Sequence, residues 1–235
     1  MTDVVIFAAG LGSRLGLGLP KCLVHVSGKP ILQYQLDAIN HTLEQCTIHI
    51  ITGYCHKQVE MFLAGYKGRN RIITHRNPFF EEAGICGSAW IASQFITSQS
   101  VLRLDGDVII SADSLKKLMK QNTSTLLTAD CFYGKKTNVV KLDKGNFVQS
   151  ISLEENYSGA DEWICVELYC NGEYVPLVEA AIDTLPRDAH YYEALNLYFQ
   201  KGIKFSVLHA DHVYEIDTPE DLKMTEAELA YAAKN

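Results

Sequence analysis

The chain opens with a continuous apolar run, Thr2 to Ala8, which leads directly into a glycine-rich loop between Ala9 and Lys21. An apolar run of this length is typical of a strand buried on both faces, as in a parallel sheet covered by helices. Similar runs then alternate with helix-like segments. Strands are predicted at residues 47–52, 71–75, 101–104 and 124–129, and helices at 30–39, 57–63, 87–95 and 115–119. This alternation predicts an α/β fold with a mostly parallel sheet flanked by helices.

The pattern changes in the second half of the chain. Three strand-like runs, 138–142, 147–153 and 163–169, lie close together, and Lys144-Gly145-Asn146 is typical of a turn between the first two. They predict a small antiparallel insertion. Helices are expected again at 177–182, 191–199 and 219–232, with a last strand at 203–208. We expect a single domain over residues 1–235, with a core at 1–130 and an elaborated half at 131–235.

The net charge and the distribution of apolar residues and cysteines argue against some classes of binding partner and location. The 235 residues carry a formal net charge of −7, which argues against a general binder of nucleic acid or anionic membranes. No run of about 18 apolar residues predicts a membrane span, and the N-terminus lacks the pattern of a signal peptide. Seven cysteines without a CxxC pair favour free thiols. A cytoplasmic location is therefore expected.

The glycine-rich loop matches neither standard nucleotide motif. The dinucleotide pattern GxGxxG would need glycine where Leu15 stands, and the phosphate loop would need glycine where Pro20 precedes Lys21. The loop still offers backbone N–H groups together with Arg14 and Lys21, a combination that suits phosphate oxygens. The alternative is a tight strand-to-helix turn in which both cations face solvent.

A family resemblance rests on several motifs in order. Phe7 to Leu15 followed by Pro20-Lys21 resembles the AAGxGxR and PK signature of nucleotidyltransferases that activate sugar phosphates and alcohol phosphates. Five further segments resemble motifs of the same family, namely Gly28 to Leu32, Thr52 to Glu60, Asn77-Pro78, Leu104 to Asp107 and Glu215 to Leu222. The resemblance implies a Rossmann-like fold of the nucleotide-diphospho-sugar transferase type. It also implies catalytic roles for Arg14 and Lys21, and an antiparallel insertion that binds the acceptor.

Two acidic motifs are candidates for binding Mg²⁺. Asp105-Gly106-Asp107 follows a predicted strand, and ligands of parallel sheets bind outside the carboxyl ends of strands. Mg²⁺ prefers carboxylates together with substrate phosphates, so Asp107 is the expected ligand and Asp105 a supporting carboxylate. The resemblance implies Asp217 as the second ligand. The alternative for Asp217-Thr218-Pro219-Glu220 is an N-terminal helix cap.

The resemblance is greatest to small cytidylyltransferases, which implies CTP and a small phosphorylated or phosphonate acceptor. Cys86 to Ala89 lies where relatives place a turn that contacts the base. The nucleotide-binding residues implied are Ala8, Ala9, Gly10, Gly12, Ser13, Gly87, Ser88 and Asp105. A sugar-1-phosphate transferase that uses UTP, dTTP or GTP is the alternative enzyme, and a non-catalytic nucleotide-binding module is the alternative outside enzymes.

The acceptor is expected in the second half of the chain. Acidic groups beside aromatic faces there would suit a cationic amine. The candidates are Lys141, Glu162, Trp163, Tyr192 and Glu193. Core aromatics with solvated acids are the alternative interpretation. No nucleic-acid or membrane partner is expected, and the sequence leaves a homodimer open.

Overall fold

The computed structural model describes residues 1–12 and 15–232, together with the backbone but not the side chains of 132–135. The strands are β1 (Thr2–Ala8), β2 (His25–Val26), β3 (Lys29–Pro30), β4 (Cys46–Thr52), β5 (Arg71–Arg76), β6 (Ser100–Asp105), β7 (Val108–Ile110), β8 (Thr125–Leu142), β9 (Val148–Tyr169), β10 (Ser206–His209) and β11 (Val213–Glu215). The helices are α1 (Ile31–Thr42), α2 (His56–Gly65), α3 (Gly84–Ser93), α4 (Ala112–Leu118), α5 (Tyr174–Thr184), α6 (Tyr191–Gln200) and α7 (Pro219–Ala232), with a short 3-10 helix, η2 (Lys21–Leu23).

A seven-stranded sheet runs through both halves of the chain in the order β10-β8-β9-β6-β1-β4-β5. Its neighbours pair in parallel except at β9, which is antiparallel to both β6 and β8. The prediction of a mostly parallel α/β sheet is therefore confirmed. Strands from both halves of the chain pair in this one sheet, and the single domain over residues 1–235 stays a prediction.

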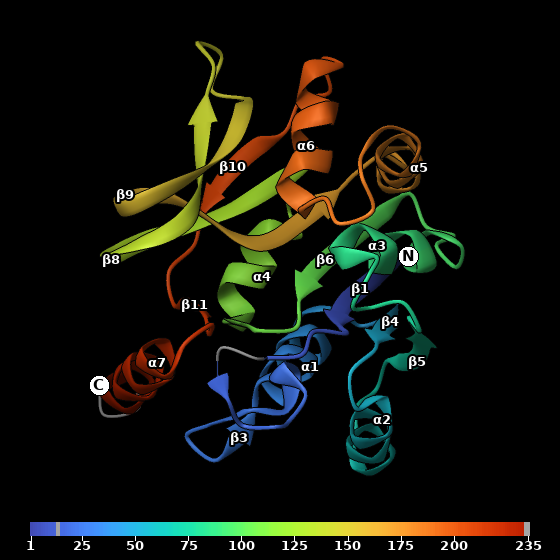
Figure 1. Ribbon diagram of the computed structural model, residues 1–235, viewed down its shortest axis with the longest axis vertical. Coiled ribbons are helices and arrows are strands. Elements are labelled where there is room, and N and C mark those ends of the chain that lie inside the picture. Colours follow the sequence, from blue (N-terminus) through green and yellow to red (C-terminus); the bar gives the residue numbers. More distant parts are fainter. Residues whose placement is uncertain (13–14, 233–235) are drawn as a thin grey trace.

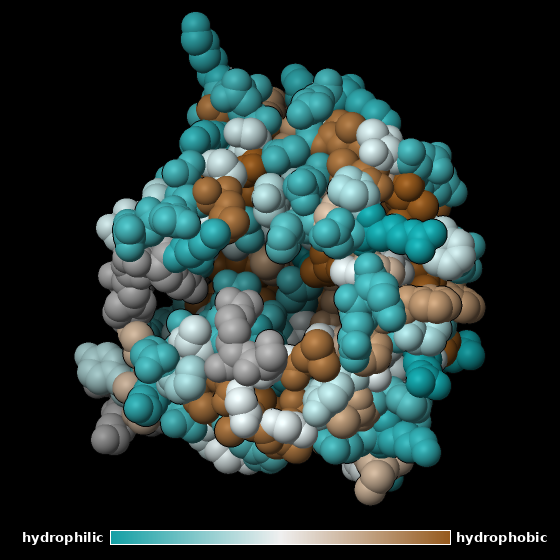
Figure 2. Space-filling model, in the orientation of Figure 1, coloured by the Kyte–Doolittle hydropathy of each residue, from teal (hydrophilic) through white to brown (hydrophobic). Residues whose placement is uncertain are grey.

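Helices cover the sheet on both sides (Figure 1). α3, α5 and α6 pack against one another, and α6 also contacts β9. α1 packs against α4 and β7. Strand β1 has Val4, Val5 and Ile6 completely buried, as its uninterrupted apolar sequence predicts. As a space-filling surface, the face shown is hollowed near its centre, below β8 and β9 (Figure 2).

The second half differs from the prediction in its strand lengths. The runs at 124–129 and 138–142 belong to one strand, β8, and those at 147–153 and 163–169 to another, β9. The two strands form a long antiparallel pair with several register shifts, and Cys165 in β9 has a positive φ of 55°. The antiparallel insertion is thus present, but it is built from extensions of two strands of the main sheet.

Two further observations concern the cysteines and the expected lack of a membrane span. No disulfide links any of the seven cysteines in the described part of the chain, as the sequence predicts. Within residues 1–12 and 15–232, no helix is long and apolar enough to cross a membrane.

Candidate active site

The carboxyl ends of β1 and β6 lie side by side, and Phe7 is paired with Asp105. The backbone N–H of Gly106 donates to the carbonyl oxygen of Phe7, with an N···O distance of 2.9 Å. A Cβ atom at residue 106 would lie 2.6 Å from that oxygen, so glycine is needed for this close approach. The turn after β6 thereby places Asp105 and Asp107 at the edge of the sheet where ligands of such folds bind.

A short antiparallel pair brings Asp217 to the same place. β11 pairs with β7, with Glu215 opposite Val108. Just beyond this pair, the N–H of Ile216 donates to the carbonyl oxygen of Asp107 at 3.0 Å. Asp107 and Asp217, which are far apart in the sequence, are thus held next to each other.

Capping of α7 does not use the carboxylate of Asp217. The Thr218 hydroxyl accepts from the N–H of Asp221 at 3.2 Å, while Asp221 Oδ2 accepts from the N–H groups of Asp217 and Thr218 at 3.0 and 2.8 Å. Thr218 and Asp221 therefore cap the helix, and the Asp217 side chain is turned toward Lys21.

Lys21 lies between the two carboxylates. Its Nζ is 2.5 Å from Asp107 Oδ2 and also donates to Asp217 Oδ1, and its side chain is 14% exposed. Burial disfavours the charged ammonium, but the attraction of Asp107 and Asp217 outweighs burial and raises the pKa of Lys21. Lys21 is therefore a cation held at the edge of the sheet rather than a solvent-facing side chain.

The carboxylates fit a divalent cation. Asp107 Oδ1 is buried without a hydrogen-bond partner in the described residues, so one oxygen of this group is available for a ligand. Over the same residues, no cluster of three or more His, Cys, Asp and Glu side chains could hold a metal ion by itself. Two carboxylates completed by substrate phosphates and waters are a donor set that suits Mg²⁺.

A pocket of about 250 Å³ lies directly beside this group. Ala8, Ala9 and Gly10 form one wall, and the turn from Asp105 to Asp107 forms another. Burial raises the pKa of Asp105 to about 6, an effect that Arg103 opposes and Asp107 increases. The remaining lining residues are Phe7, Lys21, Cys22, Phe80, Gly84, Ile85 and Ser88.

Three other predicted nucleotide-binding residues, Gly12, Gly87 and Ser88, lie outside the two walls formed by residues 8–10 and 105–107. Gly12, with a φ of 62°, lies against Lys21, and a Cβ there would be 3.3 Å from the Cβ of Lys21. Residues 86–89 lie within α3 rather than in a turn, and the Cys86 thiol donates to the carbonyl of Ala189 at 3.5 Å. Gly87 is on the same helix, where Asn77 donates to Ser88 at 3.1 Å. The predictions for Ser13 and Arg14 lie outside the described residues.

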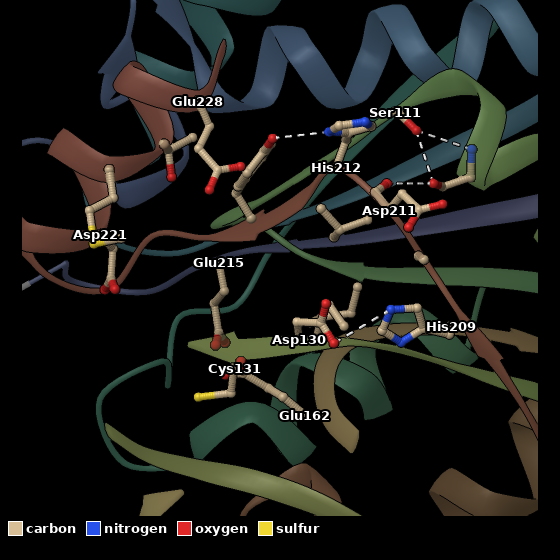
Figure 3. A pocket seen from close by; sticks show the side chains of 18 of the residues that line it. Ser111, Asp130, Cys131, Glu162, His209, Asp211, His212, Glu215, Asp221 and Glu228 are labelled. Carbon is tan, nitrogen blue, oxygen red and sulfur yellow. Dashed lines mark hydrogen bonds and ion pairs between the residues drawn. The ribbon is translucent and has the colours of Figure 1, made fainter. Parts of the chain in front are cut away.

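A second, larger cavity of about 520 Å³ lies between α7, the start of α4, residues 129–131 of β8 and residues 162–164 of β9. Figure 3 shows Asp221 and Glu228 of α7 facing this cavity across from Cys131 and Glu162, with Glu215 between them. Its charged and ionisable lining residues are Asp113, Lys117, Asp130, Cys131, Glu162, His209, Asp211, His212, Tyr214, Glu215, Asp221 and Glu228. Among these described side chains carboxylates greatly outnumber cations, so they favour positive charge in the cavity.

The five predicted acceptor residues are not gathered in one place. Glu162 is 4% exposed, lines the larger cavity and accepts from the Thr137 hydroxyl at 2.5 Å. Lys141 is exposed on β8 and pairs with Glu154 at 3.1 Å. At the start of α6, the Tyr192 ring stacks on His190, and the Glu193 carboxylate accepts from the His190 N–H at 2.7 Å as a helix cap. Their contacts with an acceptor stay predictions.

Trp163 has its ring in the core. It is 2% exposed, and together with Phe7 and Tyr191 it surrounds a buried cation of the protein itself, the guanidinium of Arg103. Of the two aromatic side chains that the sequence suggested for a cationic acceptor, Trp163 thus contacts Arg103, and it lines neither cavity. The sequence signal for this arrangement was an arginine within an otherwise apolar strand, Val101 to Leu104.

Sequence reasoning missed another side chain that shapes the site. Gln35 of α1 is fully buried, and its Nε2 donates to the carbonyl oxygens of Asp105 at 2.6 Å and Val108 at 2.8 Å. It therefore holds the turn that carries Asp107. A polar residue on the apolar face of a helix was the signal that could have identified it.

Comparisons with known proteins identify the family of the chain. The model of the MobA-like NTP transferase domain family matches residues 4–140. The chain belongs to this family. The bifunctional protein GlmU of Pseudomonas paraeruginosa is 32% identical over 173 residues, which cover 69% of this chain and 35% of the relative. GlmU of Francisella philomiragia is 26% identical over 230 residues, covering 93% and 49%. The chain thus spans between a third and a half of the length of these curated relatives.

Several solved structures share the fold along nearly the whole chain. The CTP:phosphocholine cytidylyltransferase of Streptococcus pneumoniae has a TM-score of 0.76 at 21% identity, covering 97% of this chain and 99% of that one. The inositol-1-phosphate CTP transferase of T. maritima has 0.74 at 18%, covering 96% of each. A protein of Bacillus anthracis described as a glucose-1-phosphate thymidylyltransferase has 0.79 at 16%, covering 97% and 95%. These likenesses establish a Rossmann-like nucleotidyltransferase fold.

Proposed function

We propose that the chain is a Mg²⁺-dependent nucleotidyltransferase that transfers CMP from CTP to a small phosphorylated or phosphonate acceptor and releases pyrophosphate. The observation that carries this proposal is the contact of Lys21 with both Asp107 and Asp217 beside a pocket formed by the ends of β1 and β6. A cation and two carboxylates at this position suit the handling of a triphosphate. Family membership supports the same reaction class.

The proposed reaction is an in-line displacement at the α-phosphorus. An oxygen of the acceptor's phosphate or phosphonate forms a bond to this phosphorus while the bond to the pyrophosphate oxygen breaks. Little covalent work falls to the protein, which positions two anions and neutralises their charge. Lys21 would move from the carboxylates to the phosphates and stabilise the charge that develops there. Arg14, the second predicted cation, lies outside the described residues.

Asp107 and Asp217 are the residues that would hold Mg²⁺. When bound, the ion neutralises and orients phosphate oxygens. The two aspartates are acceptors only, so their part in the reaction is to fix the position of that positive charge relative to the nucleotide pocket. Asp105 lines the pocket from the same turn but pairs with Arg103, which favours a supporting role over direct coordination.

Three observations support CTP as the nucleotide. The order and spacing of motifs resemble those of small cytidylyltransferases. Two of the structurally similar proteins have names that specify CTP. The wall formed by Ala8 to Gly10 offers backbone groups, and Ser88 adds a hydroxyl, so polar atoms are available to the edge of a pyrimidine base.

The charge of the larger cavity favours an acceptor with a cationic head group. Glu162 and Glu215 lie in this cavity, and Glu215 is two residues from Asp217. A phosphate near Asp217 could thus have an amine extending toward Glu162. This proposal replaces the aromatic contacts expected from the sequence with carboxylates, since Trp163 is in the core.

A hexose 1-phosphate with UTP, dTTP or GTP is the second candidate. The name of the protein from Bacillus anthracis, whose fold is similar, favours it. A non-catalytic nucleotide-binding module is the candidate outside enzymes. The cytoplasmic location, the homodimer and the absence of nucleic-acid and membrane partners stay predictions.

Release of pyrophosphate from a panel of substrates tests the proposal. Each of CTP, UTP, dTTP, GTP and ATP is combined with phosphocholine, phosphoethanolamine, aminoethylphosphonate, inositol phosphate and hexose 1-phosphates. We expect the highest kcat/KM with CTP and an amine-bearing acceptor. Preference for another nucleotide with a hexose phosphate would identify the second candidate, and no release with any pair would favour the non-catalytic module.

A further inference from the structure

Arg103 is a charged side chain in the core that the proposed reaction does not use. It lies on β6, is 0% exposed, and is opposite Glu167 of β9 in the antiparallel register. Its Nη1 donates to both carboxylate oxygens of Glu167 at 2.9 and 3.1 Å, and its Nη2 donates to Asp105 Oδ1. One guanidinium thus joins a strand of the second half of the chain to the turn that carries Asp107.

The surroundings of Arg103 hold it in one orientation. The guanidinium lies 4.1 Å from the ring centroid of Tyr191 and 4.7 Å from that of Phe7. Its Nε has no hydrogen-bond partner among the described residues. The aromatic rings restrict the plane of the group, and the two carboxylates fix its direction within that plane.

Stability alone gives little reason for such an arrangement. Removing charges from water is costly, and well-packed apolar residues often replace a buried ion pair without loss of stability. Arg103 can also orient a carboxylate by donating a hydrogen bond to it, and an apolar side chain in its place could not do so. Asp105 is that carboxylate, because it is the member of the group that also lines the nucleotide pocket.

The turn from Asp105 to Asp107 is also held through its backbone and through the contact of the Asp107 side chain with Lys21. Gly106 donates to Phe7, Gln35 donates to the carbonyl of Asp105, and Ile216 donates to the carbonyl of Asp107. Arg103 adds a charged contact to a side chain of this turn, two residues from the expected metal ligand Asp107. The backbone contacts fix where the turn lies, and the guanidinium fixes which way its first carboxylate points.

We propose that Arg103 is a positioning residue that links the Asp105 carboxylate to Glu167 of β9 and so fixes the turn that presents Asp107 to the nucleotide and metal. Its effect on nucleotide binding rests on the proposed function, whereas its effect on the turn does not.

The role is tested by comparing the single variant Glu167→Met with the double variant Arg103→Met and Glu167→Met, which differ from each other only at Arg103. Glu167→Met removes the buried partner but leaves Arg103 paired with Asp105. Arg103→Met combined with Glu167→Met removes the Arg103–Glu167 pair and leaves Asp105, 16% exposed at the pocket, without its cation, so we expect the fold to persist at a lower stability. Arg103→Lys keeps the charge but lacks the fork that reaches both carboxylates, and it serves if the double variant does not fold.

Two measurements follow for each variant. Hydrogen exchange of the peptide containing residues 105–108 is measured without ligand, and binding of Mg²⁺ with CTP is measured by calorimetry. We expect exchange in the double variant to be faster, and binding weaker, by roughly tenfold relative to Glu167→Met, the scale of one lost hydrogen bond to a charged group. Arg103→Lys should fall between wild type and the double variant.

The outcomes separate the two proposals. A purely structural role would lower the melting temperature of both variants and leave exchange at residues 105–108 and nucleotide affinity equal between them, which would overturn the positioning role. Faster exchange in the double variant together with a wild type that binds no Mg²⁺ and CTP would support the positioning role and contradict the nucleotide proposed above.

Discussion

Among single residues, Lys21, Asp107 and Asp217 could each be singled out from motifs, but their contact could not. It depends on the pairing of β7 with β11, two strands of three residues each, which are too short to leave a periodic signal. The roles of Arg103 and Gln35 were missed for a related reason. A polar residue in an apolar segment shows that a partner exists, whereas the identity of the partner follows from the fold.

Replacing Lys21 tests the residue that carries the proposed function. Lys21→Ala should lower kcat by about 100-fold or more, because the charge developing on the phosphates loses a preorganised cation. Lys29→Ala is the matched control, since the Lys29 ammonium also contacts a carboxylate, that of Asp37, but at the surface. Near-normal turnover of Lys21→Ala with every nucleotide would show that Lys21 does not bind the transferring phosphates.

At the scale of elements, the parallel core was predictable and the antiparallel extension was only partly so. Buried strands such as β1 and β4 leave uninterrupted apolar runs. The outer part of β9, from Glu154 to Asp161, is exposed or half-buried and polar. Because this part has no buried face, its sequence does not alternate between apolar and polar residues. β9 was therefore predicted as two separate strands, 147–153 and 163–169.

The turn after β6 gives a prediction at this scale. Gly106→Ala should lower the free energy of unfolding by about 1–3 kcal/mol, because the new Cβ would meet the carbonyl oxygen of Phe7. Gly65→Ala at the end of α2 is the control, since no atom lies within 4 Å of its added Cβ. Urea unfolding of both variants measures the difference. Equal stabilities would mean that the close approach of this turn to β1 is not required.

Across the whole molecule, β9 joins the two halves, since it pairs with β6 on one side and β8 on the other. The α/β class and the order of most elements followed from the sequence. The insertion of one antiparallel strand into the sheet did not, because strand direction depends on long-range pairing rather than on local composition.

Global stability should depend on pH through a buried histidine. His49 is 4% exposed, and burial lowers its pKa despite the nearby Asp3. Below about pH 6.5 the unfolded chain therefore binds the proton first, and stability falls as pH falls, by at most about 1.4 kcal/mol per pH unit for one group. Glu167, whose pKa burial raises to about 7, acts in the opposite direction, so a variant is needed to isolate the effect.

His49→Phe provides that comparison. Urea unfolding at pH 7.5 and 5.5 should show that the wild type loses more stability on acidification than His49→Phe does. Equal losses in the two proteins would contradict the assignment of a neutral, buried His49.

The most direct test of the proposed site compares the wild type with Asp217→Asn. Thr218 and Asp221 cap α7, so this change should leave the fold intact while it removes one of the two carboxylates that meet at Lys21. With Mg²⁺, CTP and the best acceptor from the panel, pyrophosphate release by Asp217→Asn should be about 100-fold slower or more. Release within a few-fold of the wild type would show that the chemistry does not take place between Lys21, Asp107 and Asp217.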